Sequence, residues 1–245
     1  MDGPLRHLDQ KARHMTYVAQ AQRYQIPREV IALAERHGVK SSHERGMVHL
    51  MQTGRMRTNK EARWMPFTAR QSISVIHCAF DWRARTGPFR LEWICDTLEN
   101  GEGKLSVKAL GLVPMTHFKQ SAALTRGQLI RYLAELPLAP DAMVCNDWLV
   151  WRSLDENRLS VSAGTGDKAV EVIFTLDHDG LVGEGFAERP RAVGSDFVMT
   201  PWRGRYSDYR LHKGRRLPFA AEVEWEIDGS ACVVWQGRME SWDIG

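Results

Sequence analysis

At 245 residues and a net charge of +3, the chain has the size of one large β domain or of two small domains. Hydrophobic residues make up 43 % of it, an ordinary share for a folded protein that buries a sizeable core. Arginine and lysine are mixed with aspartate and glutamate along the whole chain. This pattern argues against a nucleic-acid partner, because nucleic-acid binders usually concentrate basic residues on one face.

The metal-binding residue types are scattered. The four cysteines lie far apart and the nine histidines form no H-x-x-x-H pair, so we expect no metal site and no cofactor. No apolar run approaches the ~18 residues of a transmembrane helix. The N-terminus lacks the apolar region of a secretory signal. We therefore expect a cytoplasmic protein.

Residues 1–40 are predicted to form an N-terminal helical arm. Residues 4–24 are polar, with apolar residues at roughly helical spacing. They predict an amphipathic helix that docks on its own domain, with peripheral contact to a membrane surface as the alternative. A second short helix follows, with Pro27 in its first turn and Gly38 just past its end. Its apolar face is formed by Val30, Ile31 and Ala34.

From Met47 onward the hydrophobic period changes to two. Apolar and polar residues alternate in several segments, which is typical of an antiparallel sheet with one buried face. The residues predicted to share such a face are Phe89, Leu91, Trp93 and Cys95 in one segment, Val170, Val172, Phe174 and Leu176 in a second, and Val223, Trp225 and Ile227 in a third. Turn signals at 99–103, 177–180 and 228–229 separate the strands. We expect about ten strands.

A helix at about 125–136 interrupts this pattern. Thr125 is predicted to cap it, with Gln128 completing a capping box and Pro137 ending the helix. One face carries leucines, and the other carries Tyr132 and Glu135. We expect this crossover helix to cover the open face or the mouth of the sheet, within one β domain of residues 41–245.

Six segments occur together in one order: RWMPFTARQ (63–71), FDWRAR (80–85), GEGKLSVKALGL (101–112), RYLAELPLAP (131–140), PWRG (201–204) and GRRLPFAAEVEW (214–225). The set resembles a bacterial domain family of unknown function over about residues 26–240. The arrangement is also similar to the open half-barrel of bacterial lipoprotein carriers and sorting proteins. That likeness implies a mainly β fold in which one strongly curved antiparallel sheet wraps around an apolar cavity, with helices as a lid.

Glu135 and Tyr132 are the candidate catalytic residues. If their helix face looks into the cavity, desolvation would raise the pKa of Glu135 and suit it to proton transfer. Tyr132 or Tyr206 would then donate a hydrogen bond to developing negative charge. The alternative for Glu135 is an ion pair with an arginine such as Arg131 or Arg152.

Candidate ligand-binding residues come from one crowded segment and from polar strand positions. PWRGRYSDYR (201–210) holds a tryptophan, two tyrosines and three arginines, which can clamp an anionic or planar ligand. Alternatively, this is a segment fixed by buried rings. Polar groups on the concave face of a sheet would orient a ligand. The predicted ligand-binding residues are Gln71, Asp81, Trp82, Trp148, Trp202, Arg203 and Tyr206.

These observations predict that the protein binds a small hydrophobic or amphipathic molecule in the cavity of a β half-barrel. The alternative function is a cofactor-independent acid–base enzyme of the isomerase, cyclase or hydratase type. It would act on a hydrophobic substrate in the same cavity.

Overall fold

The computed structural model describes residues 26–40, 46–109, 113–117, 120–194 and 196–245, so the predicted helix at 4–24 lies outside the described residues. The described helices are α2 (Arg28–Arg36), α3 (Ala122–Ala134) and α4 (Ala142–Cys145), with short 3-10 helices at Pro88–Arg90, Leu136–Leu138 and Gly166–Lys168. None of them is long and apolar enough to cross a membrane. The strands are β1 (Met47–Met56), β2 (Met65–Ser74), β3 (Phe80–Thr86), β4 (Glu92–Glu99), β5 (Glu102–Ala109), β6 (Val113–His117), β7 (Val150–Ser153), β8 (Arg158–Ala163), β9 (Val170–Leu176), β10 (Val182–Val193), β11 (Asp196–His212), β12 (Arg215–Ile227) and β13 (Ser230–Ile244).

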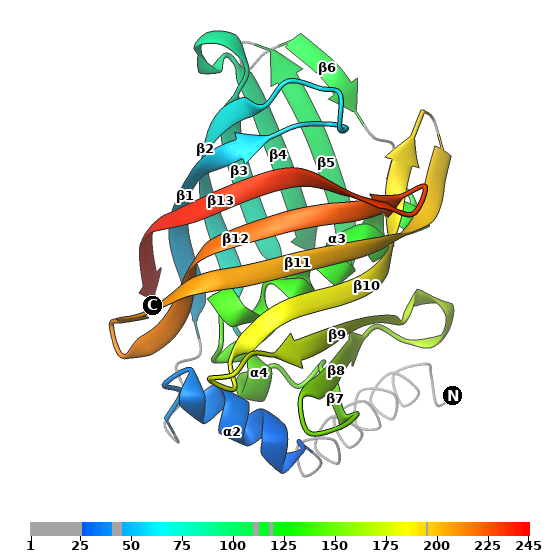
Figure 1. Cartoon of the computed structure of the whole chain (residues 1–245). Helices are drawn as coiled ribbons and strands as arrows, with labels where there is room; N and C mark the ends of the chain where they lie inside the picture. Colours follow the sequence, from blue (N-terminus) through cyan, green and yellow to red (C-terminus); the bar gives the residue numbers. More distant parts are fainter. Residues whose placement is uncertain (1–25, 41–45, 110–112, 118–119, 195) are drawn as a thin grey trace, which may run out of the picture.

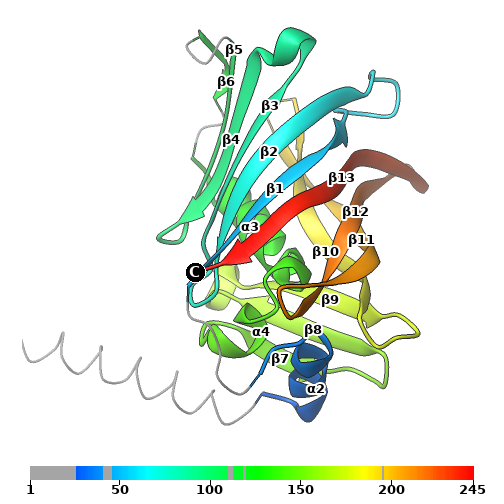
Figure 2. The same ribbon diagram turned by 90° about the vertical axis from the view of Figure 1, so that its left-hand side faces the viewer.

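The strands in the described part of the chain form a single antiparallel sheet of 13 strands, ordered β6-β5-β4-β3-β2-β1-β13-β12-β11-β10-β9-β8-β7. Strands that are consecutive in sequence pair with each other, except that β6 and β7 lie at opposite edges of the sheet and β1 pairs with β13 at the centre. The sheet is open and strongly curved (Figures 1 and 2). The predicted fold class is confirmed. The expected number of strands was too low, since strands as short as β7 contain too few residues to show alternation.

Helix α3 connects the two edges of the sheet. The chain leaves edge strand β6, passes through α3 and α4, and re-enters the sheet at the opposite edge strand β7. Figure 2 shows α3 enclosed by the curved sheet, and α3 contacts β4 and β5 on one side and β8, β9 and β10 on the other. The predicted crossover helix is therefore present, and it lies against the concave face.

Two predicted hairpins have the expected turn geometry. Asn100 and Gly101 join β4 to β5, and Asp228 and Gly229 join β12 to β13. All four residues have positive φ, between 50° and 74°. A two-residue turn with positive φ at both positions matches the right-handed twist of paired strands. These turns therefore fix the register of each hairpin.

The predicted buried face is right for β9 and wrong for β4. Val170, Val172 and Phe174 of β9 are buried. In β4, however, Trp93 is 44 % exposed and packs under the guanidinium of Arg85 on the outer face. The inward residues of this segment are instead Ile94, Asp96 and Leu98, of which Asp96 and Leu98 are buried. A buried aspartate made the true inner face look polar in the sequence.

The start of α3 also differs from the prediction. The N-cap is Ser121, whose hydroxyl accepts a hydrogen bond from the Leu124 amide. Thr125 lies one turn inside the helix, and its hydroxyl accepts from the Gly103 amide of β5. Ser and Thr are both good caps, so local sequence alone does not show which of them begins the helix. The contact of Thr125 with β5 explains why Ser121 is the cap.

Helix α2 packs on the α4 and β7 side of the domain. Its buried face is Val30, Leu33 and Ala34, whereas Ile31 is 42 % exposed, which corrects the predicted face. The helix ends as expected, since Gly38 has φ +84° and follows the last helical turn. There a Cβ would meet the Gly214 main-chain oxygen at 2.2 Å.

Two buried polar contacts attach the arm and the α3–β7 connection to the start of β12. The Nδ1 atom of His37 lies 2.7 Å from the Arg216 main-chain oxygen, so Nδ1–H donates. The guanidinium of Arg215 donates to both carboxylate oxygens of Asp141, at 2.7 and 2.8 Å. Asp141 is fully buried. A charged carboxylate at a buried position is stable only when an opposite charge, here that of Arg215, lies next to it.

Replacing Asp141 with asparagine should therefore lower the free energy of unfolding by about 3–5 kcal/mol, because it removes the buried carboxylate that accepts two hydrogen bonds from the Arg215 guanidinium. Urea denaturation measures this loss. The apolar double variant Asp141→Leu, Arg215→Met should recover most of the stability. A loss below about 1 kcal/mol would be that of an exposed ion pair and would contradict this role.

His37 should make stability depend on pH. Burial lowers the pKa of His37 from 6.5 to about 4, and its buried Nε2 atom has no hydrogen-bond partner among the described residues. The unfolded chain therefore takes up a proton before the folded chain does. Stability should be full above pH 6.5 and fall by about 3 kcal/mol as the pH drops toward 4.

The measurement is the urea midpoint across this pH range for three proteins: the wild type, His37→Gln, and His178→Gln as an exposed control. The His37 variant should show a flatter dependence than the other two. Parallel curves for all three proteins would contradict the assignment.

Candidate functional site

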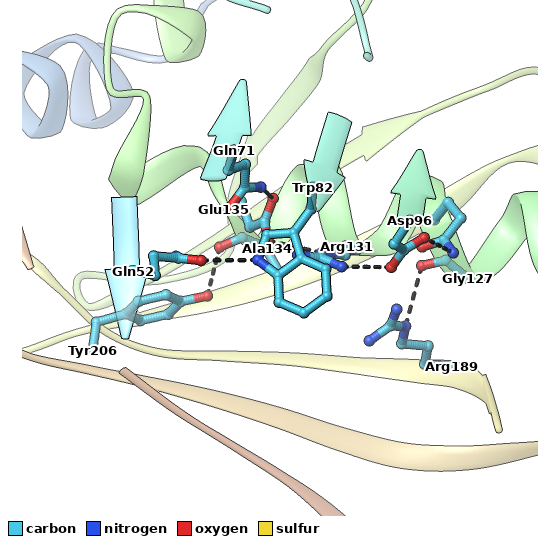
Figure 3. Close-up of polar contacts among 11 residues, drawn as sticks. Gln52, Gln71, Trp82, Asp96, Gly127, Arg131, Ala134, Glu135, Arg189 and Tyr206 are labelled. Carbon is cyan, nitrogen blue, oxygen red and sulfur yellow. Dashed lines mark hydrogen bonds and ion pairs between the residues drawn. The ribbon is translucent and has the colours of Figure 1, made fainter. Parts of the chain in front are cut away.

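A polar row crosses the concave face of β2, β3 and β4. Gln71 is the cross-strand partner of Trp82, and Trp82 is the partner of Asp96. All three side chains are buried. Successive strands therefore present them side by side toward the same helix (Figure 3).

The facing side of α3 carries Gln128, Arg131 and Glu135, spaced so that all three lie on one helix face. The guanidinium of Arg131 is central. Its Nη1 lies 2.5 Å from Asp96 Oδ2, and its Nε lies 2.9 Å from Glu135 Oε1. The same group lies over the rings of Phe80 and Trp82, each 4.9 Å from the ring centroid. Arg131 thus bridges the helix and the sheet.

Two amides complete this cluster. Gln71 Nε2 donates to Glu135 Oε2 at 2.5 Å, and Gln128 Nε2 donates to Asp96 Oδ1. Burial raises the pKa of Asp96, and the charge of Arg131 opposes that rise. Burial alone would lower the pKa of Arg131, but Glu135 and Asp96 outweigh it and raise the pKa overall. Each charged group in the cluster therefore has at least two hydrogen-bonding partners within it.

A cavity of about 220 Å³ opens beside this cluster. Its walls come from the concave faces of β1, β3 and β10–β13 and from the end of α3. Most of its lining is aromatic or aliphatic, and polar groups gather at the α3 end. The aromatic lining residues are Trp82, Trp202, Tyr206, Phe219, Trp225 and Trp235. The polar or charged residues at the α3 end are Gln52, Arg131, Glu135 and Arg189.

Arg189 enters the cavity from β10. Its Nε donates to the Gly127 main-chain oxygen at 3.1 Å. Its guanidinium lies over the rings of Trp202 and Trp225, 5.5 and 5.8 Å from their centroids. Burial, followed by the charge of Arg131, lowers the pKa of Arg189 to about 10. The group remains a cation at neutral pH.

Five of the predicted site residues lie at this cavity or in the polar cluster beside it. Trp82, Trp202, Tyr206 and Glu135 line the cavity. Gln71 does not line it but donates a hydrogen bond to Glu135. The hydroxyl of Tyr206 donates to the Ala134 main-chain oxygen at 2.5 Å, which ties β11 to the end of α3 (Figure 3). The indole of Trp82 donates to Gln52 at 2.9 Å.

The other four predicted residues lie elsewhere. The hydroxyl of Tyr132 donates to the Ser74 main-chain oxygen and accepts from Asn146, in the core behind α3. Asp81 is on the outer face, in an ion pair with Arg83. Trp148 precedes β7, and its side chain is 54 % exposed. Arg203 also lies away from the cavity.

Arg203 shows why the crowded segment was misleading. In β11, Trp202 and Tyr206 point into the cavity, so the intervening odd position 203 points outward. There Arg203 pairs with Glu226 of β12 at 3.0 Å and lies near Glu184 of β10. Up to Ser207 the segment is therefore a paired strand with a cavity-facing side and an ion-paired outer side, and Asp208, at φ +57°, interrupts the pairing.

Asp96 and Arg189 were missed, although the sequence held a signal for both. Each occupies an inward position of an alternating strand: Asp96 follows Ile94 and precedes Leu98, and Arg189 follows Ala187. A charge in the apolar phase of a strand indicates a buried partner or a ligand. Trp225, predicted as core, lines the cavity.

Glu135 forms the ion pair with Arg131 that was the structural alternative, whereas Arg152 lies at an exposed position of β7. Both tyrosine hydroxyls named for the acid–base function donate to main-chain oxygens. In the described part of the chain, no group of three or more His, Cys, Asp or Glu residues is placed to hold a metal ion.

The structure is an open antiparallel half-barrel with a helix against its concave face. The chain belongs to the family of unknown function DUF6920, whose model matches residues 25–243, and this confirms the resemblance inferred from the sequence. No curated protein sequence matches the chain.

Similar solved structures include proteins of the lipoprotein-carrier kind. One is described as an outer membrane lipoprotein-sorting protein domain from Vibrio parahaemolyticus (TM-score 0.49, 7 % identity, 88 % of this chain and 91 % of that chain covered). Another is a LolA superfamily protein from Nitrosomonas europaea (TM-score 0.45, 6 % identity, 88 % and 93 % covered). Both similarities are distant, and the ligand proposed below follows from the residues of this cavity.

Glu135→Gln should lower the free energy of unfolding by about 1–3 kcal/mol, since it removes the charged acceptor of Arg131 and places an amide against the Gln71 donor. Thermal and urea denaturation measure the loss. In an Arg131→Met background the same change should cost much less, because the two residues act as a pair. Asp155→Asn, in an exposed ion pair with Arg158, is the control and should change stability little. An unchanged stability for Glu135→Gln would show that the ion pair is not structural.

Proposed function

We propose that the protein binds a small hydrophobic or amphipathic molecule in the cavity between the curved sheet and α3. The observation that carries this proposal is an aromatic-lined cavity of about 220 Å³ with Gln52, Arg131, Glu135 and Arg189 gathered at its α3 end. Ligand sites have this composition, with an apolar wall that supplies affinity and a few polar groups that fix orientation.

The volume of the cavity limits the size of the ligand. Ligand pockets typically hold about 300–1,000 Å³. A cavity of about 220 Å³ lies just below this range and suits a molecule with a short apolar chain or a single ring system.

The apolar wall is rigid, as a preformed site requires. The ring of Trp235 stacks on Phe67 with centroids 5.5 Å apart, and it lies over Gly237, where a Cβ would meet it at 2.1 Å. Trp82 is fixed by its hydrogen bond to Gln52. Side chains held in this way need little ordering when a ligand binds, which lowers the entropic cost of association.

No observation in the site favours turnover over binding. Glu135 accepts hydrogen bonds from Arg131 of its own helix and from Gln71 of β2, and the second contact connects α3 to the sheet. Non-covalent binding therefore uses every part of the site as it stands.

The test is a fluorescence titration with the neutral apolar probe N-phenylnaphthylamine. The wild type should bind it, with an increase in emission. Ala221→Phe places a ring in the cavity and should weaken binding by about tenfold or more, since it displaces several buried methylene contacts. Ala231→Phe, at an exposed position of β13, is the matched control and should bind like the wild type.

Equal probe binding by all three proteins, with unchanged circular dichroism spectra, would overturn the cavity as the binding site. Native mass spectrometry supplies an independent readout. Wild-type protein purified from cells should carry a bound molecule that the Ala221→Phe variant lacks.

A further inference from the structure

We propose that Arg189 binds the acidic head group, a carboxylate or a phosphate, of an amphipathic ligand whose apolar part lies on the tryptophan wall of the cavity. This inference rests on the proposed function and specifies the ligand's chemistry. The geometry that supports it is the position of Arg189 between the polar cluster and the apolar lining.

Arg189 has hydrogen-bonding capacity that the protein does not use. Its Nε is engaged by the Gly127 main-chain oxygen. Among the described residues, its two terminal nitrogens have no hydrogen bond and no carboxylate within ion-pair distance, and Figure 3 draws them without a contact. A guanidinium whose terminal nitrogens are both available can bind an oxyanion with two parallel hydrogen bonds.

Arg131 is different, although it lies nearby. Its guanidinium contacts both Asp96 and Glu135, so its charge is already compensated by two carboxylates. An incoming anion would meet Glu135 at that position and be repelled. The third arginine of the cavity lining, Arg238, is exposed and forms an ion pair with Asp208 at 2.9 Å. Arg189 is therefore the arginine of the lining that can accept an anion.

The surroundings of Arg189 make a bound anion favourable. Its guanidinium lies over Trp202 and Trp225, in an apolar wall where a charge is poorly solvated. The carboxylates of Asp96 and Glu135 act on it only at a distance, through space. An anion in direct contact would replace the lost solvation, and direct contacts outweigh separated ones inside a protein.

The wall holds a second unused donor. The indole Nε1 of Trp202 is buried and has no hydrogen-bond partner in the described part of the chain. A ligand oxygen bound at Arg189 would be an acceptor close to this indole, since the guanidinium lies over the same ring. Unpaired buried donors favour an acceptor over an apolar group.

The position of Arg189 also sets the orientation of the ligand. It lines both the main cavity and a second one of about 150 Å³ on the α3 side of Trp225. A head group at Arg189 leaves the aromatic lining, from Trp225 to Trp235, for the apolar chain. A neutral apolar molecule would use the wall but leave Arg189 unpaired. The site therefore selects an acidic amphiphile.

The experiment compares molecules that share a chain or a head group. Decanoate, decanol and acetate compete with N-phenylnaphthylamine for the wild type and for Arg189→Gln, Arg189→Lys and the exposed control Arg152→Gln. In Arg189→Gln, decanoate should compete about tenfold or more weakly, the effect of losing a charged hydrogen bond, whereas decanol should change less than about threefold.

Arg189→Lys keeps the charge without the planar pair of donors, so its affinity for decanoate should lie between those of the wild type and the glutamine variant. It carries the test if the glutamine variant does not fold. Arg152→Gln should match the wild type, and acetate should not compete.

If both Arg189 variants changed the affinities for decanoate and decanol equally, or changed neither, the proposed role of Arg189 would be wrong. Probe binding by the same proteins would still support the proposed function. Competition by acetate as strong as that by decanoate would replace the amphiphile with a bare anion site. If the wild type bound no probe at all, both proposals would fail.

Discussion

The arrangement of the molecule depends on one largely enclosed guanidinium, that of Arg131, whose side chain is 18 % exposed. A buried charge is tolerated only when its partners are in place, and here Asp96 comes from the sheet while Glu135 comes from the same helix. Helix α3 therefore has one favourable position on the concave face, in which Arg131 reaches β4 and stacks on Trp82 of β3. Hydrophobic burial alone would tolerate sliding of the helix, because apolar contact is not directional.

The cavity follows from this fixed helix position. Two contacts from the opposite part of the sheet hold α3 at different points, since Arg189 of β10 donates to Gly127 and Tyr206 of β11 donates to Ala134. The helix is thus connected to both halves of the curved sheet. Several inner-face residues of β12 and β13 line the cavity, whereas Leu217 of β12 and Trp242 of β13 belong to the packed core. Ion pairs and hydrogen bonds, not a lack of apolar side chains, keep the space open.

Local patterns predicted the fold well because they are determined by neighbours in sequence. Alternation of period two indicated the strands, and an Asn-Gly or Asp-Gly pair indicated a turn that needs positive φ. The same patterns could not place Asp96, because the residue that makes its burial tolerable, Arg131, is 35 positions away. They failed for Thr125 for a related reason, since its hydroxyl binds β5 and not its own helix. What sequence reasoning lacked was the partner of each buried polar group.

The candidate site shows the same division. Glu135 and Tyr132 looked functional because acidic and phenolic groups on a short helix suit catalysis, yet both are engaged in contacts that hold α3 in place. Arg189 was not among the predicted site residues. In the fold, two carboxylates and two arginines meet near the cavity, and Arg131 contacts both carboxylates. The second arginine, Arg189, lies in an apolar wall without a direct counter-ion among the described residues, so an acidic ligand would supply that contact.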